Sequence, residues 1–368
     1  MTTPIPIYRP SFDEREEAAV AEVLRSGWIG LGPKTEEFEE RFSRHVGARF
    51  AVAMNSATAA LHVALKLLEL RPRDEVLVPT LTFVATAMVA AYDGVVPVLC
   101  DIERDYLCLD VADAEARITK RTGAVMPVLY GGHVMPDVDI GVPAIYDCAH
   151  AVGSGFDPRG KICCWSFHAV KNVTTGDGGM LTTDDEDLYR RALRLRWLGI
   201  DKSTWADVDR VDRWEYPIVE VGYKYHMNDI AAALGLVQLA KLEEMQAIRH
   251  RLVRQYLEEL ADVPGLELPT YEADSAWHLF VVRTEHRDEL AVYLHERGIH
   301  TGAHYKPIHL YPMYHAHPLP VAEEEWPKLL TLPLFPGLTS GEISQISDAV
   351  KAGLRELSNQ PESLVARR

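Results

Sequence analysis

The stretch SFHAVKNVTTGDGG, residues 166–179, joins the end of an apolar run to a glycine-rich turn and carries one lysine, Lys171. The run that leads into it, ICCWSF (162–167), has the length and composition of a strand buried on both faces. Lys171 is therefore expected on a loop at the carboxyl end of a strand, where α/β sheets hold their ligands. The glycines after it permit a tight turn and a close backbone approach to a ligand. A loop lysine beside glycines is nevertheless usually a surface residue, so the rest of the chain must decide.

Six further runs of the same kind predict the architecture. They are rich in Val, Ile and Leu and are bounded by turn residues. They read FAVAMN (50–55), EVLVP (75–79), VVPVLCD (95–101), GAVMPVLY (123–130), PAIYDCAH (143–150) and GGMLTT (178–183). Helical patterns, such as residues 56–70 and 82–94, separate several of them. This alternation predicts an α/β fold with a mostly parallel sheet.

The last third of the chain has a different character. Residues 228–263 keep a helical period for much longer than an average helix, with room for one break. A mixed region follows, with a strand (277–284), a helix (287–298) and a final helix that Thr339 or Ser340 can cap with Glu342. We place a boundary near residue 240. The expected domains are a large α/β domain, 1–240, and a smaller α+β domain, 241–368.

Composition excludes several classes of protein. The formal net charge of −16 argues against nucleic-acid and acidic-membrane partners, which are bound by dense basic faces. The five cysteines are odd in number and form no CxxC pair, so we expect buried, reduced thiols. The first residues lack a signal-peptide pattern, and no apolar run approaches the ~18 residues that span a bilayer. We therefore expect a cytoplasmic protein.

Two further motifs suggest a cofactor. In NSATAALHVAL (55–65), small and hydroxyl residues open a predicted helix directly after a strand. The free N–H groups of that helix and Thr58 can hold a phosphate, although a plain cap by Asn55 or Ser56 is equally compatible. Asp147 ends an apolar strand, where a carboxylate is costly unless it is paired, and a protonated ring nitrogen is such a partner.

A phosphate cradle, a carboxylate for a pyridine nitrogen and a lysine for an aldehyde together describe a site for pyridoxal 5'-phosphate. The combination carries this interpretation, because each motif alone is weak. Such a site also needs an aromatic ring beside the cofactor. Phe83 in PTLTFVATA (79–87) is the candidate, and simple core packing is an equally good explanation of it.

With these motifs in their order, the sequence resembles the DegT/DnrJ/EryC1/StrS family of sugar aminotransferases, which have the fold-type I architecture of pyridoxal-phosphate enzymes. The resemblance runs through nearly the whole chain. It includes SGWIGLGPKTEEFEERF (26–42), NSATAALHVAL, YDCAHAVG (146–153), SFHAVKNVTTGDGGML (166–181), VGYKYHMNDIAAALGLVQLAKLE (221–243), HYKPIHL (304–310) and LTLPLFPGLT (330–339).

The resemblance implies a role for each motif residue. Lys171 is the lysine that forms the Schiff base, and Asp147 is the partner of the pyridine nitrogen. The remaining cofactor contacts that it implies are Ala57, Thr58 and Ser166 at the phosphate, Phe83 stacked on the ring, and His150 beside the ring. A homodimer with shared sites is also implied, in which Lys224 or His226 of GYKYHM (222–227) reaches the partner's phosphate or substrate. His304, Tyr305 and His309 match the stretch that lines the sugar pocket.

This chain departs from its family in two places. Relatives commonly carry Asn or Arg where it has His226, a change that can make binding sensitive to pH. Residues 133–147 are shorter than usual and leave no room for the helix normally found there. Some relatives have histidine in place of the lysine and act as sugar dehydratases, and Lys171 points away from that subgroup.

By the same resemblance, the reaction is a two-stage transamination with L-glutamate as the amino donor. The amino group then passes to a keto-sugar attached to a nucleoside diphosphate. Residues 222–227 are more similar to the subgroup that acts on 4-keto sugars, so the expected substrate is a nucleotide-linked 4-keto-6-deoxyhexose. A ketone without a nucleotide, such as a keto-cyclitol, stays open.

Three rival interpretations are weaker. A regulatory protein that keeps the fold without turnover is disfavoured by the intact Lys171 and Asp147. A metal site in the histidine-rich stretch is disfavoured because prolines break any regular ligand spacing and no carboxylate joins the cluster. The histidines concerned are His300, His304, His309, His315 and His317. A dinucleotide site is excluded because no GxGxxG follows a strand.

Overall fold

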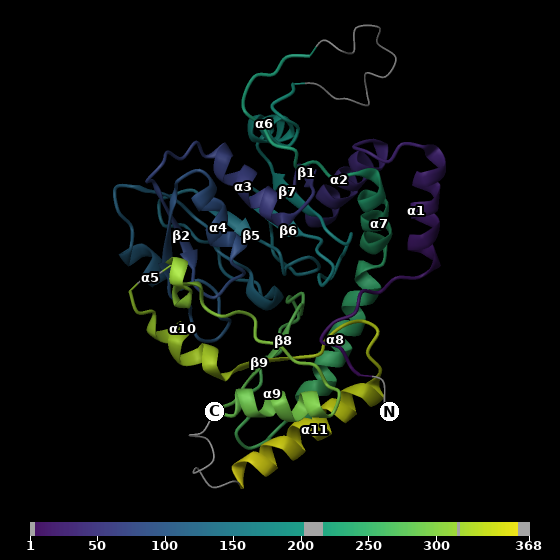
Figure 1. The fold of residues 1–368 in the computed structure, drawn as a ribbon, viewed down its shortest axis with the longest axis vertical. Helices are drawn as coiled ribbons and strands as arrows, with labels where there is room; N and C mark the ends of the chain where they lie inside the picture. The colour runs from purple at the N-terminus through teal and green to yellow at the C-terminus, as the bar shows by residue number, and fades with distance from the viewer. Residues whose placement is uncertain (1–3, 202–215, 315–316, 360–368) are drawn as a thin grey trace.

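The computed structural model describes residues 4–201, 216–314 and 317–359. Each of the seven predicted runs forms a strand. Their bounds are β1 (Phe50–Met54), β2 (Glu75–Pro79), β3 (Val96–Cys100), β4 (Thr122–Val125), β5 (Ile145–Asp147), β6 (Ile162–Ser166) and β7 (Gly179–Thr183). They are ordered β3-β2-β4 and β5-β6-β7-β1, and parallel bridges from Val125 to Ala144 and from Val128 to Asp147 join β4 to the β5 side. The result is one continuous layer in the upper part of the molecule (Figure 1).

Strand direction explains how the lysine loop is built. The pairs β2·β3, β2·β4 and β5·β6 are parallel, as predicted, whereas β7 runs antiparallel to both β6 and β1. Parallel neighbours require a crossover connection, but antiparallel neighbours can be joined by a simple loop. The connection between β6 and β7, residues 167–178, therefore needs no crossover helix, and it carries Lys171 across the carboxyl end of β6.

The helices of this part cover the sheet and its edges. They are α1 (Glu14–Ser26), α2 (Pro33–Val46), α3 (Ala57–Leu67), α4 (Ala85–Tyr92), α5 (Val111–Ala116) and α6 (Glu186–Arg196). α3 packs on β5, β6 and β7 through a nearly all-buried, apolar sequence. Asp13 caps α1 in a capping box with Glu16, which satisfies free N–H groups at that helix start. Between β4 and β5, all of whose residues the structure describes, there is a short 3-10 helix, η1 (Tyr130–Gly132), and no α-helix, as the shortness of residues 133–147 predicted.

The long helical stretch breaks once. α7 (Asp229–Ala240) and α8 (Leu242–Glu259) meet at Lys241, whose side chain is only 3% exposed. Its ammonium lies 2.8 Å from Glu16 and 3.1 Å from Asp13, so the buried charge at the break is paired with α1. α8 then runs down to the second part of the molecule (Figure 1).

The second part is built on a two-stranded antiparallel sheet. It consists of β8 (Phe280–Arg283), β9 (Leu329–Leu332), α9 (Arg287–Glu296), α10 (Pro320–Glu325) and α11 (Ser340–Ser358). Thr339 caps α11 and Glu342 completes the capping box, as predicted. In Figure 1, α9 and α11 lie together at the lower end, next to the start of the chain.

Two clusters of buried apolar side chains form the core, one under the large sheet and one around β8 and β9. Chain order does not separate them cleanly. Ile5 pairs with Ile299 and is buried in the second cluster, whereas Ile308 and Leu319 are buried in the first. The boundary at residue 240 stays a prediction.

Two expectations from composition can be compared with the structure. All five cysteines are free and buried, as predicted. Within the described ranges, no helix is both long and apolar enough to cross a membrane.

Candidate active site

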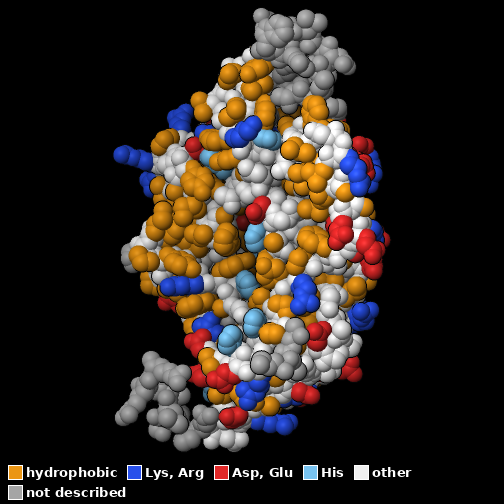
Figure 2. Space-filling view, turned by 45° about the vertical axis from the view of Figure 1, so that its right-hand side comes forward, with side chains coloured by type: hydrophobic (Ala, Val, Ile, Leu, Met, Phe, Trp, Pro, Cys, Tyr) orange, Lys and Arg blue, Asp and Glu red, His pale blue; other side chains and the backbone are white. Residues whose placement is uncertain are grey.

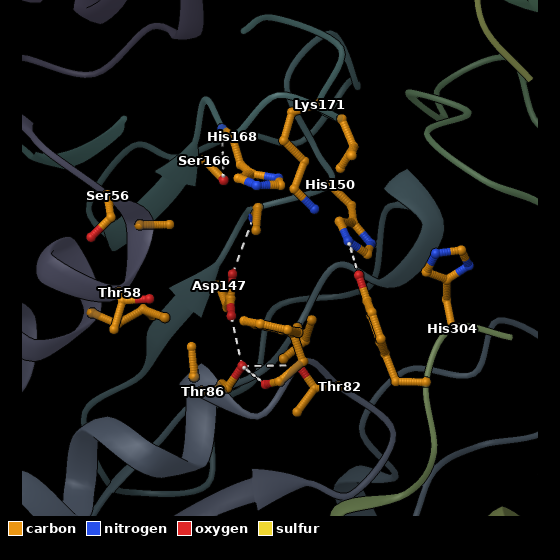
Figure 3. Close-up of a pocket in the computed structure, with 18 of the residues that line it drawn as sticks. Ser56, Thr58, Thr82, Thr86, Asp147, His150, Ser166, His168, Lys171 and His304 are labelled. Atoms are coloured by element: carbon orange, nitrogen blue, oxygen red, sulfur yellow. Dashed lines mark hydrogen bonds between the residues drawn. The ribbon is translucent and has the colours of Figure 1, made fainter. Parts of the chain in front are cut away.

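A cavity of about 320 Å³ opens at the carboxyl ends of β5 and β6, against the stretch that enters the second part of the chain. Its walls come from the segments that follow β1, β2, β4, β5 and β6 and from residues 304 and 305. Figure 3 shows Lys171, His150 and Asp147 pointing toward the same space. The lining includes nearly every predicted cofactor residue of the large domain: Ala57, Thr58, Phe83, Asp147, His150, Ser166 and Lys171.

One end of the cavity is formed by the start of α3. Ser56 is the N-cap, and its hydroxyl accepts from the N–H of Ala59 at 3.1 Å. The N–H groups of Ala57 and Thr58 have no protein acceptor within the described part of the chain, so they are available to an anion. The helix cap and the phosphate site, the two interpretations of this motif, are therefore compatible. Ser56 caps the helix and leaves two N–H donors free.

A glycine brings β7 against this helix start. A Cβ atom on Gly179 would lie 2.4 Å from the nitrogen of Ala57 and 2.4 Å from the carbonyl of Ser56. Only glycine permits this contact between the strand and the helix. Ser166, which pairs with Gly179 on β6, is 4% exposed and lines the same end of the cavity. The structure thus gathers two backbone donors and two hydroxyl side chains at one place.

Asp147 is the buried carboxylate at the centre. It is 4% exposed, and its oxygens accept from the Thr86 hydroxyl at 2.9 Å and from the Ala149 N–H at 3.1 Å. Burial raises the pKa of Asp147, and the two hydrogen bonds and the charge of Lys171 oppose that rise. A cationic partner in the cavity would remove the remaining cost of burying this charge.

Lys171 reaches the cavity from the β6–β7 loop, where its N–H donates to the carbonyl of His168 at 2.9 Å. Burial lowers the pKa of its ammonium from 10.5 to about 8, although the nearby carboxylate of Asp147 opposes the shift. About a tenth of this amine is therefore uncharged at pH 7, far more than for an ordinary lysine. An accessible amine of this kind can attack a carbonyl carbon.

His150 has a defined tautomer. Its Nδ1 accepts from the Gly131 N–H at 3.1 Å, so the proton of the neutral ring lies on Nε2, which donates to the Tyr305 hydroxyl at 3.2 Å. Burial, with the charges of Lys171 and His304, keeps the pKa of His150 well below 6.5. His150 is thus a neutral hydrogen-bond donor that faces the cavity.

The predicted substrate residues are placed differently from one another. His304 and Tyr305 line the cavity, and Phe83 stands at its rim, 58% exposed, with its ring 5.8 Å from that of Tyr305. His309 is not among the lining residues. Its nitrogens bond instead to Thr80 at 2.7 Å and to Glu323 at 3.1 Å, so it links α10 to the end of β2.

Lys224 and His226 lie away from this cavity, on the outside of the large domain. The Lys224 ammonium sits 3.6 Å from the ring centre of Trp197, and the His226 ring lies 4.2 Å from the same indole. Burial and the charges of Lys224 and Arg196 lower the pKa of His226 to about 4. Neither residue is among those that line the cavity of its own chain.

Several lining residues escaped the sequence analysis. They are Thr82, Thr86, Tyr130, His168 and Asp177. Thr86 was missed because its partner lies 61 positions away, which no local pattern reveals. His168 and Asp177 flank Lys171 within the quoted stretch, so their nearness in sequence was an available signal. The described residues hold no group of three or more metal-ligating side chains, and His315 lies outside them.

The donor set fits pyridoxal 5'-phosphate. Free N–H groups suit its phosphate, the buried Asp147 suits a protonated ring nitrogen, and the amine of Lys171 suits its aldehyde. A cavity of about 320 Å³ lies at the lower end of the range for small-molecule sites.

Comparison with known proteins agrees with this chemistry. Residues 10–351 match the sequence profile of the DegT/DnrJ/EryC1/StrS aminotransferase family. The protein MJ1066 of Methanocaldococcus jannaschii is 36% identical over 379 aligned residues, which cover 94% of this chain and 97% of that protein.

Solved structures give the same result. The aminotransferase TlmJ from Streptoalloteichus hindustanus superposes with a TM-score of 0.89 at 34% identity, covering 96% of this chain and 100% of that one. Spr1654 from Streptococcus pneumoniae, provisionally named a sugar aminotransferase, has a TM-score of 0.90 at 32% identity, with the same coverage, in its PMP form. It has also been solved in a PLP form.

Proposed function

The chain belongs to the DegT/DnrJ/EryC1/StrS aminotransferase family, and from this premise we propose that it aminates a keto-sugar carried on a nucleoside diphosphate, with L-glutamate as the amino donor. Its fold is that of the fold-type I enzymes, and it is a sugar aminotransferase that uses pyridoxal 5'-phosphate. The regulatory alternative without turnover is thereby set aside. The nucleotide, the 4-keto-6-deoxyhexose and the donor belong to the proposal.

The cofactor supplies an electron sink for the carbanion that forms at the donor's α-carbon. We assign its phosphate to the N–H groups of Ala57 and Thr58 with Ser166. Asp147 holds the proton on the ring nitrogen, and its position is fixed by Thr86. We assign His150 to the ring hydroxyl, toward which its Nε2 proton would turn from the Tyr305 hydroxyl when the cofactor is bound. Phe83 covers the outer face of the ring.

Lys171 Nζ has two tasks in this assignment. Its amine would hold the cofactor through the aldehyde, and once displaced by the donor it would take the donor's α-proton as a general base. A base works best when its pKa lies near the working pH, and burial lowers the pKa of Lys171 to about 8. In the second stage Lys171 would return a proton to the former keto carbon of the sugar, which gains the amino group taken from the donor and loses its oxygen as water.

We propose a homodimer in which each site is completed by the other subunit. Figure 2 shows hydrophobic side chains gathered on one face of the molecule. Lys224 is exposed and His226 is half-buried, and both lie beside exposed apolar side chains. Among them are Leu198, Ile218, Val219 and Val221, which are 44% to 83% exposed. Such a surface is typical of a protein interface. Lys224 or His226 would then supply a donor to the partner's phosphate or substrate.

His304 and Tyr305 are proposed to contact the sugar. Burial lowers the pKa of His304 to about 4, so it enters the site as a neutral ring whose Nδ1 bonds to the Thr331 hydroxyl at 2.9 Å. His309 holds α10 and the end of β2 together, so its proposed contribution to the pocket is through the stretch that it anchors.

The convergence of Lys171, Asp147 and the start of α3 on one cavity is the observation that carries this proposal. The test loads the protein with cofactor, adds L-glutamate and follows the loss of visible absorbance. A panel of nucleotide-linked 3-keto and 4-keto sugars and a keto-cyclitol is then offered, and recovery of absorbance identifies the acceptor. Recovery with a nucleotide-linked 4-keto sugar is expected. Recovery with the keto-cyclitol alone, or no response to glutamate, would contradict the proposed substrate or donor.

A further inference from the structure

A second group of polar side chains lies outside the cavity, where α3 meets the end of α4. Its centre is His62 of α3, which is 3% exposed. His62 Nδ1 lies 3.1 Å from the Tyr225 hydroxyl, and Nε2 lies 3.0 Å from a carboxylate oxygen of Asp93. Lys66, one turn further along α3, donates to the other oxygen of Asp93 at 3.1 Å. Both nitrogens of this histidine are used, and neither serves the cavity.

The hydrogen bonds of this group have one consistent direction. An ionised carboxylate can only accept, so His62 carries its proton on Nε2 and donates to Asp93. Burial lowers the pKa of His62, although Asp93 opposes the shift. In the neutral ring Nδ1 is then an acceptor, and the Tyr225 hydroxyl donates to it. Asp93 thus fixes the tautomer of His62, and His62 fixes the phenol of Tyr225.

The side chains of residues 222–227 alternate between two faces, as in any extended segment. Tyr223 and Tyr225 lie on the inner face, stacked with ring centres 4.9 Å apart, and the ring of Tyr223 is 4.7 Å from that of His62. Lys224 and His226 lie on the other face, against Trp197. The face that carries the two tyrosines is held by His62, and it therefore determines where the side chains of Lys224 and His226 lie.

The backbone of this segment is held on both edges. The Tyr225 carbonyl accepts from the Asn55 N–H at 2.7 Å, and the Tyr225 N–H donates to the Arg196 carbonyl at 3.0 Å. The carbonyl of Lys224 accepts from the Asn55 side-chain amide at 3.3 Å. These hydrogen bonds fix the position of the backbone. The hydrogen bond between Tyr225 and His62 then mainly sets the rotation of the segment about them.

The group also connects two places that matter for the cofactor. Thr58, at the phosphate end of the cavity, and His62 are four residues apart on α3, so they are one above the other on that helix. The 222–227 segment carries the two side chains assigned to the neighbouring subunit's site. One helix therefore contacts the cofactor of its own chain and supports the residues meant for the partner.

We propose that Asp93, His62 and Tyr225 are positioning residues that hold Lys224 and His226 in place for the cofactor phosphate of the other subunit. This inference rests on the proposed homodimer with shared sites. A buried group beside α3, outside the cavity of its own chain, would thus affect the cofactor site of the other chain.

The first test is the affinity of the apoprotein for pyridoxal 5'-phosphate, followed by its visible absorbance. Tyr225→Phe removes one hydroxyl and keeps the stacked ring, so we expect the Kd to rise about three- to tenfold, the factor that one hydrogen bond is worth. His62→Phe, which removes the acceptor for Tyr225 and keeps a ring against Tyr223, is expected to act alike. The matched control is Tyr271→Phe, since the Tyr271 hydroxyl bonds to His250 Nδ1 at 3.0 Å on α8. An unchanged Kd in both test variants overturns the inference.

The second test separates an effect on the partner from an effect within one chain. Hybrid dimers are purified with two different tags, and Lys171→Ala leaves only one site able to bind the cofactor covalently. When Lys171→Ala is paired with Tyr225→Phe, the remaining site receives an unaltered segment, and the wild-type Kd is expected. When the double variant Lys171→Ala/Tyr225→Phe is paired with wild type, that site receives the altered segment, and the raised Kd is expected.

The opposite pattern, or a raised Kd in both hybrids, would show a local structural effect and overturn the inference. The thermal midpoint of the apoprotein is measured for every variant and is expected to change as little as it does in Tyr271→Phe. Failure of the proposed function is distinguishable, because the wild-type protein would then be monomeric or would form no absorbing complex with the cofactor.

Discussion

The hydroxyl of Thr86 lies 2.9 Å from an oxygen of Asp147 and is buried with it. Thr86 has one proton to give, and both an Asp147 oxygen and the Phe83 carbonyl, 3.0 Å away, can accept it. When the proton goes to Asp147, the Thr86 oxygen accepts from Thr82, also 2.9 Å away. The start of α4 therefore orients the carboxylate that we assign to the cofactor's ring nitrogen. This contact was not predictable from either residue alone.

Asp147→Asn should lower kcat about 10²- to 10³-fold, the range seen when one preorganised electrostatic contact is lost. Asparagine preserves the size of the side chain and loses the negative charge that holds a proton on the ring nitrogen. Thr86→Val should cause a smaller fall, because it removes one hydrogen bond and leaves the charge. The rate of absorbance loss on adding glutamate measures both. A wild-type rate in Asp147→Asn would refute the assignment.

Lys171→Ala should abolish covalent attachment of the cofactor and lower turnover by about 10²- to 10⁴-fold or more, because a general base is lost with the attachment point. Borohydride reduction of the wild-type holoenzyme followed by peptide mass mapping should label Lys171. Lys161→Ala is a suitable control, since that lysine pairs with Asp137 at 3.1 Å outside the cavity and should change nothing. A label on another side chain would exclude the proposed mechanism.

Removing the lysine should also change how stability depends on pH. Burial lowers the pKa of Lys171 to about 8 in the folded apoprotein from 10.5, so the unfolded chain binds more protons between these values. The unfavourable free energy of burying this charged amine is therefore fully present below pH 8, and it disappears as the pH rises toward 10.5. Lys171→Met should be more stable than wild type at pH 7, by up to about 3 kcal/mol.

Urea unfolding of the two apoproteins at pH 7, 9 and 10.5 tests this directly. The difference in unfolding free energy should narrow with rising pH, since all other groups cancel in the comparison. A difference in unfolding free energy that stays constant across this range would mean that burial does not lower the pKa of Lys171.

Gly179→Ala should weaken cofactor binding. Its new Cβ would lie 2.4 Å from backbone atoms of Ser56 and Ala57 and would push the start of α3 away from the phosphate. Overpacking of this kind costs about 1–3 kcal/mol of stability. Gly30→Ala is the control, because a Cβ there meets nothing within 4 Å. Cofactor titration and thermal unfolding give the two readouts, and equal cofactor affinities in both variants would contradict the predicted displacement.

Much of the architecture could be read from local patterns. Seven apolar runs became seven strands, because a strand buried on both faces leaves a clear apolar signature. Asp147 and Lys171 stood out because each places a polar group at a strand end. The reversed direction of β7 left no such signature, since apolar runs look alike whichever way they point.

Contacts between distant segments could not be predicted. His309 belongs to a motif rich in polar side chains, and only the fold shows that Thr80 and Glu323 occupy its nitrogens. Residues near the start of the chain were assigned to the large domain by position, although Ile5 packs with the second cluster. In both cases the deciding partner is far away in sequence, where periodicity and spacing carry no information.

The crossing of the two clusters has a consequence for biosynthesis. Ile5 is synthesised long before its partner Ile299, and the sheet core includes Ile308 and Leu319. Neither core can therefore be completed before these later residues have been translated. Nascent chains should therefore expose apolar surface throughout elongation, which makes this protein a natural client for chaperones during its synthesis.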